Sequence, residues 1–480
     1  MMGAFLFSCA VSIAIIWLLL ISKLAWRIAV DVPNDRSLHS RPIPRIGGWG
    51  VIPAAIAASF FFGAVQWPLA GLATLLFAVS YLDDRIGLPI LVRLTMHAVV
   101  SVTWVIFGPA NLPLLLAGIA AFSIMWWINL YNFMDGANGL AGGMGFIGFL
   151  AYAVAAISHD MMPLALWSLA LAGASAGFLL FNFHSARVFL GDCGSVPLGF
   201  FVGALGLWGW SGGAWPAWFP FLVFASFFLD ATVTLLRRMM NGEPFWRAHA
   251  EHYYQRLIRS GWSHPHTALR EYVLMAASAS LATAMLTWSV SAQYVGLVTA
   301  AGVFVGLAIL VDRRWLQFQQ EAGKTSPGWP KLQYVLVPAL LTAVAVIAVI
   351  PLRDVSLYPY IIIEAPDGLR ATFLHRGRPQ AGKCEGDVAK FVTAIQSKCP
   401  DCKIVEQNCL DKLEPNQSQM LAAGPLDVPS ARLPDGIVTF KSTNPNAALA
   451  VCRESERQAS IGPKEGFVEC YSPGQVRKLL

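Results

Sequence analysis

Charged residues are scarce in this chain of 480 residues: only 13% are Asp, Glu, Lys or Arg, while 56% are hydrophobic. A soluble protein of this size carries about 25% charged residues. The deficit argues against a soluble enzyme, a disordered chain and a nucleic-acid-binding protein. It falls almost wholly in residues 1–351, where apolar runs long enough to cross or nearly cross a ~30 Å hydrocarbon core recur. The sequence therefore predicts a polytopic membrane protein with a polar tail.

Lys and Arg are absent from alternate loops between these runs. The loops near residues 66, 110, 160, 213 and 291 carry none, whereas the loops between them carry all the basic residues that precede residue 352. By the positive-inside rule the basic loops are cytoplasmic, and both termini lie outside. The first run lacks a basic start and a cleavage site, so we interpret it as an anchor. We predict about 11–12 transmembrane helices, at roughly 3–22, 46–65, 67–81, 90–107, 112–129, 140–158, 162–181, 195–211, 215–236, 270–289, 293–311 and 332–351.

Residues 352–480 contain no apolar run long enough to span a bilayer. Short strands are predicted at 360–363, 437–441 and 466–470, and amphipathic helices at 387–398 and 447–458. The fold class expected is thus an all-α polytopic membrane protein (domain 1–351) followed by a small, extracytoplasmic α/β soluble domain (352–480).

Cysteine is rare before the tail, which holds six of the eight cysteines. An oxidising exterior favours disulfides, and six thiols allow fifteen pairings among which the sequence does not choose. The Cys399-Pro-Asp-Cys402 pair is also compatible with redox chemistry or metal binding, although a redox pair normally opens a helix. Cys9 and Cys193 are interpreted as small packing residues.

Acidic residues gather at the cytoplasmic ends of three predicted spans, at Asp83-Asp84, Asp135 and Asp192. Carboxylates at membrane depth are costly, and adjacent like charges repel each other unless a cation offsets them. Any one of these acids could be a helix cap, but the set favours chemistry with a divalent cation and phosphate.

Glycines surround these acids. The segments 129–143 and 189–195 mix glycine, amide and acidic residues at helix breaks. Glycine lets backbone N–H groups approach an anion closely, but it also permits tight helix packing in membranes. Neither segment is a Walker loop or a dinucleotide fingerprint.

Five segments in order resemble the polyprenyl-phosphate N-acetylhexosamine-1-phosphate transferases. The resemblance covers about residues 1–310, all five segments fall on the cytoplasmic side, and the tail lies outside it. The segments are 31–48 (DVPNDRSLHSRPIPRIGG), 83–89 (DDRIGLP), 129–143 (NLYNFMDGANGLAGG), 182–195 (NFHSARVFLGDCGS) and 249–257 (HAEHYYQRL).

The resemblance implies transfer of a sugar-1-phosphate from a UDP-amino sugar to undecaprenyl phosphate with release of UMP. It implies Mg2+, with Mn2+ as an alternative, held mainly by Asp192 in Phe189–Ser195. Asp83 and Asp84 resemble the acid pair that handles the acceptor phosphate, and Asp135 the first acid of an Asp-Gly-x-Asp-Gly motif. Asn132 and Asn182 resemble the amides near the nucleotide and metal.

Two departures from the family pattern matter. Asn138 replaces the second acid of that motif, so only substrate binding through its amide is expected there. His249 and His252 lie three apart, where the peptidoglycan-precursor enzyme has consecutive histidines. This spacing resembles members that initiate O-antigen and other envelope polysaccharides, including members that use UDP-FucNAc or UDP-QuiNAc.

Further basic residues are candidates for phosphate binding. Arg41 and Arg45 are expected near the acceptor phosphate, with ordinary positive-inside charge as the alternative. One face of a predicted helix carries His249, His252 and Arg256. These residues are expected to bind the phosphates of the nucleotide, and the alternative is that they belong to a solvated loop helix. His39 is expected near the phosphate, with a structural role as the alternative. Asp83 is expected to orient the acceptor, because a phosphate monoester is already mostly ionised at pH 7, and a covalent phospho-aspartate route stays open.

Two other classes of function compete with the transferase. A transporter of lipid-linked or anionic substrates would suit twelve spans, but transporters usually place acids near the bilayer midplane, often in repeated halves. A catalytically inactive scaffold is disfavoured by the intact acids at 83, 84, 135 and 192. The expected location is a bacterial inner membrane, with the active site cytoplasmic and the tail periplasmic. The sequence leaves the oligomeric state open, a homodimer included.

Overall fold

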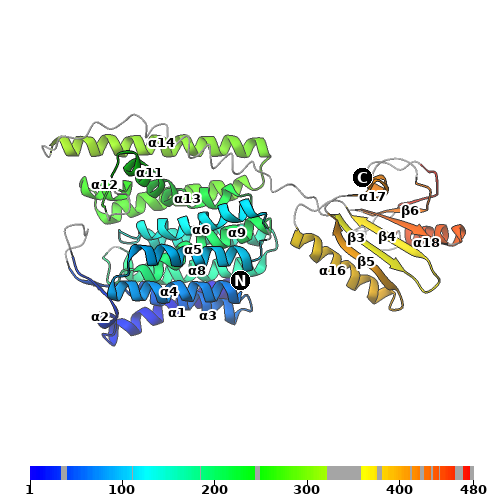
Figure 1. The fold of residues 1–480 in the computed structure, drawn as a ribbon, viewed down its shortest axis with the longest axis horizontal. Helices are drawn as coiled ribbons and strands as arrows, with labels where there is room; N and C mark the ends of the chain where they lie inside the picture. The colour runs from blue at the N-terminus through cyan, green and yellow to red at the C-terminus, as the bar shows by residue number, and fades with distance from the viewer. Residues whose placement is uncertain are drawn as a thin grey trace. The chain divides into compact units, whose positions relative to one another are not determined.

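The chain forms two compact units, residues 1–349 and 350–480, here called the membrane unit and the C-terminal unit (Figure 1). The computed structural model describes residues 1–33, 41–110, 112–183, 185–243, 249–321, 358–375, 381–410, 413–421, 426–433, 436–442, 444–459 and 469–475.

The described part of the membrane unit is built of helices with short connections. Two strands of two residues each, β1 (Val30–Asp31) and β2 (Ile43–Pro44), pair antiparallel between the second and third helices. The short helices α2 and α12 lie at the same end of the unit, opposite the N-terminus (Figure 1). The helices are α1 (Met2–Ile21), α2 (Ala25–Ile28), α3 (Gly47–Phe61), α4 (Trp67–Ile86), α5 (Ile90–Phe107), α6 (Leu114–Phe133), α7 (Leu140–Ser158), α8 (Met162–Asn182), α9 (Asp192–Ser211), α10 (Trp218–Val223), α11 (Ala225–Met240), α12 (Tyr253–Arg259), α13 (His264–Met285) and α14 (Val290–Glu321).

Seven described helices are long and apolar enough to cross a membrane: α1, α5, α6, α7, α8, α9 and α14. The chain is therefore a mostly helical, polytopic membrane protein, as the composition predicts. The predicted span at 215–236 is broken into α10 and α11 at Phe224. The predicted span at 332–351 lies outside the described residues.

Helix α9 lies at the centre of the membrane unit. Of its most apolar 18-residue window, 94% is buried, against 22% for α1 and 17% for α14. Its packing depends on glycine, because a Cβ on Gly48 of α3 would lie 2.4 Å from the backbone nitrogen of Gly194. The acid that begins α9, Asp192, is partly buried at one end of this central helix.

The C-terminal unit contains an antiparallel six-stranded sheet with the order β5-β3-β4-β7-β6-β8. The predicted strands and helices at 360–363, 437–441, 387–398 and 447–458 are present with extended bounds, and β4, β5, β6 and α17 are additional. The elements are β3 (Tyr358–Glu364), β4 (Arg370–His375), α16 (Ala381–Lys398), β5 (Lys403–Leu410), α17 (Pro415–Leu421), β6 (Ser430–Leu433), β7 (Gly436–Lys441), α18 (Pro445–Ala459) and β8 (Glu469–Tyr471).

Both faces of this sheet are covered. Burial alternates along β3, so that Ile361 and Ile363 face one side and pack with Val388 of α16. The opposite side is covered by α17, where Met420 packs against Leu374 of β4. These small clusters give the C-terminal unit a core of its own.

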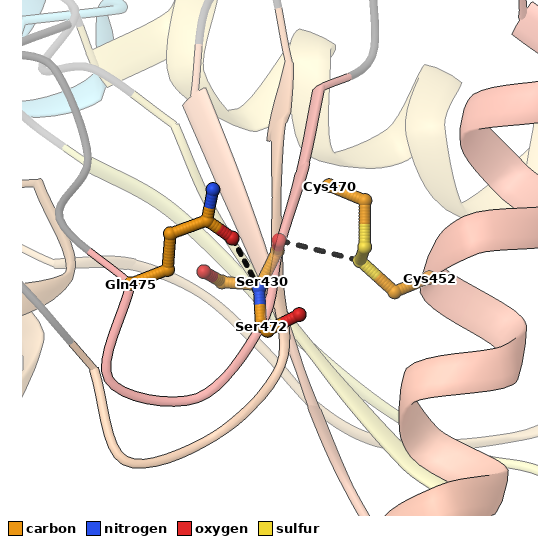
Figure 2. The surroundings of a disulfide bond; sticks show 5 residues. All are labelled: Ser430, Cys452, Cys470, Ser472 and Gln475. Atoms are coloured by element: carbon orange, nitrogen blue, oxygen red, sulfur yellow. Dashed lines mark hydrogen bonds between the residues drawn. A yellow bond between two sulfur atoms is a disulfide. The ribbon is translucent and has the colours of Figure 1, made fainter.

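The six cysteines of the C-terminal unit form three disulfides, Cys384–Cys409, Cys399–Cys402 and Cys452–Cys470. Figure 2 shows the third of these, which joins α18 to β8, with the Cys452 sulfur 3.3 Å from the carbonyl oxygen of Ser430 on β6. In the turn after β8, the backbone N–H of Ser472 donates to the side chain of Gln475. All six cysteines of this unit are therefore paired in disulfides, and the fold selects one of the fifteen possible pairings.

Candidate active site

A short backbone ladder joins the segment before α3 to the segment before α9. The N–H of Phe189 donates to the carbonyl of Pro44 at 2.8 Å, and the N–H groups of Gly47 and Gly48 donate to the carbonyls of Phe189 and Leu190 at 2.8 and 2.9 Å. Two of the predicted motifs, separated by well over a hundred residues, are thereby fixed side by side.

Arg45 lies within this ladder and binds two carboxylates. Its guanidinium is 2.9 Å from Asp31 and 3.3 Å from Asp84. Burial opposes the charge of Arg45, but the carboxylates of Asp31, Asp84 and Asp192 more than compensate and raise its pKa above the usual value. The thiol of Cys193 lies 3.6 Å from the second oxygen of Asp84 and donates to it, so Cys193 does more than fill space.

Asp83 has partners different from those of its neighbour Asp84. One oxygen accepts the backbone N–H of Leu88 at 2.7 Å, and the other lies 3.0 Å from the guanidinium of Arg93 on α5. The two adjacent carboxylates are thus offset by two separate arginines, which reduces the repulsion expected from the sequence.

Asn182 connects two of the loops. Its side-chain oxygen accepts the N–H of Gly139 at 2.6 Å, and its side-chain nitrogen donates to the carbonyl of Val188 at 2.9 Å. The hydroxyl of Tyr272 donates to the carbonyl of Gly139 at 2.7 Å from the other side. The amide of Asn182 therefore holds the 134–139 loop in place.

Asp135 and Asn132 lie at the end of α6, close to the start of α9. Burial raises the pKa of Asp135 well above its ordinary value, and the Asp192 carboxylate adds to this, while the N–H of Gly191 donates to Asp135. Gly191 has a φ of +72°, a conformation that side-chain-bearing residues rarely adopt. The side chain of Asn132 accepts a hydrogen bond from Ser195 at 2.9 Å.

A cavity of about 450 Å3 opens among α4, α5, α6, α9 and the segment around α12. At the loop end its wall includes five of the predicted site residues: Asp83, Asn132, Asp192, His249 and His252. Further along α5 and α6 the wall is mostly apolar, with Leu94, Phe122, Met125 and Trp126. Two polar side chains interrupt it, His97 and Asn129, which lie 3.3 Å apart and are hydrogen-bonded to each other. The cavity thus combines an acidic mouth with an interior that is mostly apolar.

The two histidines lie together on this wall. Their ring centroids are 5.0 Å apart. Nδ1 of His252 is 3.2 Å from Asp230 on α11, and the same carboxylate accepts the backbone N–H groups of Tyr253 and Tyr254 at 2.8 and 3.1 Å. Asp230 thus binds the first turn of α12 and the His252 ring together.

Other predicted residues lie elsewhere. Arg256 is 1% exposed, and its guanidinium is 2.6 Å from Asp312 on α14, so it does not belong to the cavity wall. Arg41 is exposed, and Asn138 is partly exposed in the turn before α7. His39 lies outside the described residues.

The donor set of the cavity fits a hard divalent cation. The carboxylate of Asp192 interacts electrostatically with those of Asp83 and Asp84, and the guanidinium groups of Arg45 and Arg93 oppose this negative charge. Across the described residues, no group of three or more His, Cys, Asp or Glu side chains is placed to hold a metal ion by itself. Mg2+ in proteins commonly binds one or two carboxylates and completes its coordination with substrate phosphates and water. Two cavity carboxylates that leave room for a substrate are therefore compatible with Mg2+ binding.

Several residues of the site were not identified from the sequence. Asp230 lies inside an apolar run and Arg93 near the start of another, and an ionisable residue at membrane depth is the signal that could have singled them out. Ser195 and Gln255 are part of motifs already recognised, but their contacts with Asn132 and the His252 backbone depend on the tertiary structure.

Comparison with known proteins adds independent evidence. The family described as Glycosyl transferase family 4 matches residues 67–209. The chain is similar to the "Probable undecaprenyl-phosphate N-acetylglucosaminyl 1-phosphate transferase" of Bacillus subtilis (strain 168), with 28% identity over 55% of this chain and 80% of the relative.

Two further relatives give the same result. The Decaprenyl-phosphate N-acetylglucosaminephosphotransferase of Mycobacterium leprae (strain TN) is 30% identical over 53% of this chain and 76% of its own length. The Undecaprenyl-phosphate alpha-N-acetylglucosaminyl 1-phosphate transferase of Yersinia pestis is 28% identical over 58% of this chain and 80% of its own length. The chain belongs to glycosyl transferase family 4, among the polyprenyl-phosphate N-acetylhexosamine-1-phosphate transferases that its loop motifs resemble.

Proposed function

We propose that this chain transfers an N-acetylhexosamine-1-phosphate from a UDP-amino sugar to polyprenyl phosphate and releases UMP. The observation that carries the proposal is the cavity that joins Asp83, Asp192 and the His249–His252 pair to an apolar interior. A lipid phosphate needs such a combination, because its head group is anionic and its chain is apolar. The names of the relatives give undecaprenyl phosphate or decaprenyl phosphate together with N-acetylglucosamine phosphate transfer.

Mg2+ is the proposed cofactor, with Mn2+ as an alternative. Asp192 and Asp83 would hold it, since both line the cavity and their negative charge is only partly offset. When bound, the cation would neutralise the donor diphosphate and make UMP a better leaving group.

The acceptor phosphate is proposed to lie between the two arginines of the acid pair. The side chains of Arg45 and Arg93 are 37% and 36% exposed, so each retains a surface for an anion while it neutralises an aspartate. Guanidinium groups bind phosphate oxygens in a bidentate fashion. Asp83 would orient the acceptor, and the apolar residues Leu94 and Phe122 would contact the first part of its lipid chain.

The nucleotide is proposed to bind at the opposite wall, near His249, His252 and Asn132. An acceptor phosphate oxygen then attacks the β-phosphorus of the donor. A bond forms between that oxygen and the phosphorus, while the bond from the phosphorus to the bridging oxygen breaks and UMP leaves with the electron pair. Positioning and charge stabilisation supply most of the catalysis in such transfers.

The location of the reaction follows from the basic loops. We propose that the site faces the cytoplasm of a bacterial inner membrane and that the C-terminal unit lies in the periplasm, where its three disulfides would persist. Initiation of O-antigen or another envelope polysaccharide is the proposed role.

The experiment that tests the function is a donor panel. Purified protein is incubated with undecaprenyl phosphate, Mg2+ and one of UDP-GlcNAc, UDP-FucNAc or UDP-QuiNAc. We expect UMP and a lipid-linked sugar phosphate in equal amounts with at least one donor, UDP-GlcNAc being the first choice. Failure of all three donors to give UMP would contradict the proposal.

A further inference from the structure

Asp230 is a buried carboxylate that the reaction scheme above does not use. It lies on α11, is 8% exposed, and accepts hydrogen bonds from the backbone of α12, from Thr234 and from the His252 ring. A carboxylate can only accept hydrogen bonds, so the Nδ1 atom of His252 must be the donor in this contact.

This contact determines which nitrogen of His252 is available to a ligand. With Nδ1–H directed at Asp230, the remaining nitrogen is Nε2, and His252 is also part of the cavity wall. A histidine that binds a ligand through one nitrogen is commonly oriented through the other nitrogen by a carboxylate.

Asp230 itself does not belong to the wall of the reaction cavity. It lines a separate small cavity of about 60 Å3 together with Ser226, Arg270 and Glu271. An effect of Asp230 on the reaction must therefore pass through a residue that does line the reaction cavity.

We propose that Asp230 is a positioning residue that acts through His252. It fixes the tautomer and the orientation of the ring, so that Nε2 is presented to the nucleotide portion of the donor. The binding of the same carboxylate to the N–H groups of Tyr253 and Tyr254 holds the start of α12 and hence the histidine in register with α11. This inference rests on the proposed function.

The test is a double-mutant cycle with Asp230→Ala, His252→Ala and the combined variant. Each single change should lower kcat/KM for the UDP-sugar about tenfold to hundredfold, which is the usual cost of losing such an orienting contact. KM for polyprenyl phosphate should stay the same. The combined variant should be no worse than His252→Ala alone, because the proposed effect of Asp230 on the reaction passes wholly through His252.

Thr234→Val is the matched control. Thr234 donates to the same oxygen of Asp230 at 3.3 Å, but it belongs neither to α12 nor to the wall of the reaction cavity. Its loss should leave the kinetics unchanged. If Asp230→Ala does not fold, Asp230→Asn takes its place in the cycle, since it keeps the size of the side chain and removes its charge.

The outcomes are distinguishable. Losses that multiply in the combined variant, or an equal rise in KM for both substrates, would overturn the role of Asp230 while the function stands. If the unmodified protein releases no UMP from any donor, the proposed function fails and this inference fails with it.

Discussion

Arg93 and Asp83 form an ion pair, with 3.0 Å between the guanidinium and the carboxylate, across the turn that joins α4 to α5. Asp83 is 9% exposed and Arg93 is 36% exposed at their side chains, so the pair presents its positive member to the cavity. Both residues line that cavity.

Arg93→Ala should therefore lower kcat for sugar-phosphate transfer about tenfold to hundredfold, since a hydrogen bond between charged groups contributes roughly 1.5–3 kcal/mol. Arg93→Lys should recover part of the loss, because it keeps the charge but not the planar fork. Steady-state kinetics with varied polyprenyl phosphate measure both. Equal activity of Arg93→Ala and the unmodified protein would show that this pair has no role in the reaction.

Gly48→Ala should destabilise the membrane unit. The new Cβ would lie 2.4 Å from the Gly194 backbone nitrogen, so α3 and the start of α9 would have to separate. Overpacking of this kind costs roughly 1–3 kcal/mol. Gly71→Ala in α4 is the control, because nothing lies within 4 Å of its Cβ. Thermal unfolding in detergent should show a lower midpoint for Gly48→Ala only, and equal midpoints would contradict the close approach of the two helices.

The three disulfides should differ in their contribution to the C-terminal unit. They close loops with separations of 25, 18 and 3 residues. The loop-entropy relation gives about 3.5, 3.2 and 1.6 kcal/mol respectively. Paired Cys→Ala variants of Cys384–Cys409 or Cys452–Cys470 should therefore become protease-sensitive at lower urea than the Cys399–Cys402 variant. The reverse order would show that loop closure is not how these bonds stabilise the unit.

The two ends of the helices should react differently with an impermeant thiol reagent. Asp160 and Asn241 are exposed in connections at opposite ends of the bundle, after α7 and after α11. In spheroplasts of a strain that expresses a Cys9→Ser background, Asp160→Cys should be labelled and Asn241→Cys should be protected until the membrane is opened. Labelling of Asn241→Cys but not of Asp160→Cys would contradict the proposed topology and indicate the opposite orientation in the membrane.

Sequence patterns were sufficient for the seven long apolar helices and for the shared location of several loop motifs, because hydropathy and the positions of basic residues can be read directly from the sequence. The apolar run does not predict the extension of α14 to Glu321, because the added residues are mostly polar and one of them, Asp312, is buried against Arg256 of α12. That pairing also explains why Arg256 is absent from the cavity wall. Asp230 escaped notice for a similar reason, since its partners follow it by more than twenty residues.

The disulfide pairing was equally hidden. Cys452 and Cys470 meet only because α18 packs over the edge of the sheet that ends in β8 (Figure 2). The spacing of the six cysteines in the sequence does not predict that packing.

The central claim is that Asp83 and Asp192 act together in metal-dependent transfer of a sugar phosphate. The test is the rate of UMP release by Asp83→Asn and Asp192→Asn. Asp160→Asn, at the opposite end of the helices, is the control with the same chemical change. Each variant is treated with EDTA and then titrated with Mg2+. We predict that the control matches the unmodified protein, that EDTA abolishes its activity until Mg2+ is restored, and that both site variants stay below about one thousandth of its rate. Normal Mg2+-dependent turnover in Asp83→Asn and Asp192→Asn would contradict the account.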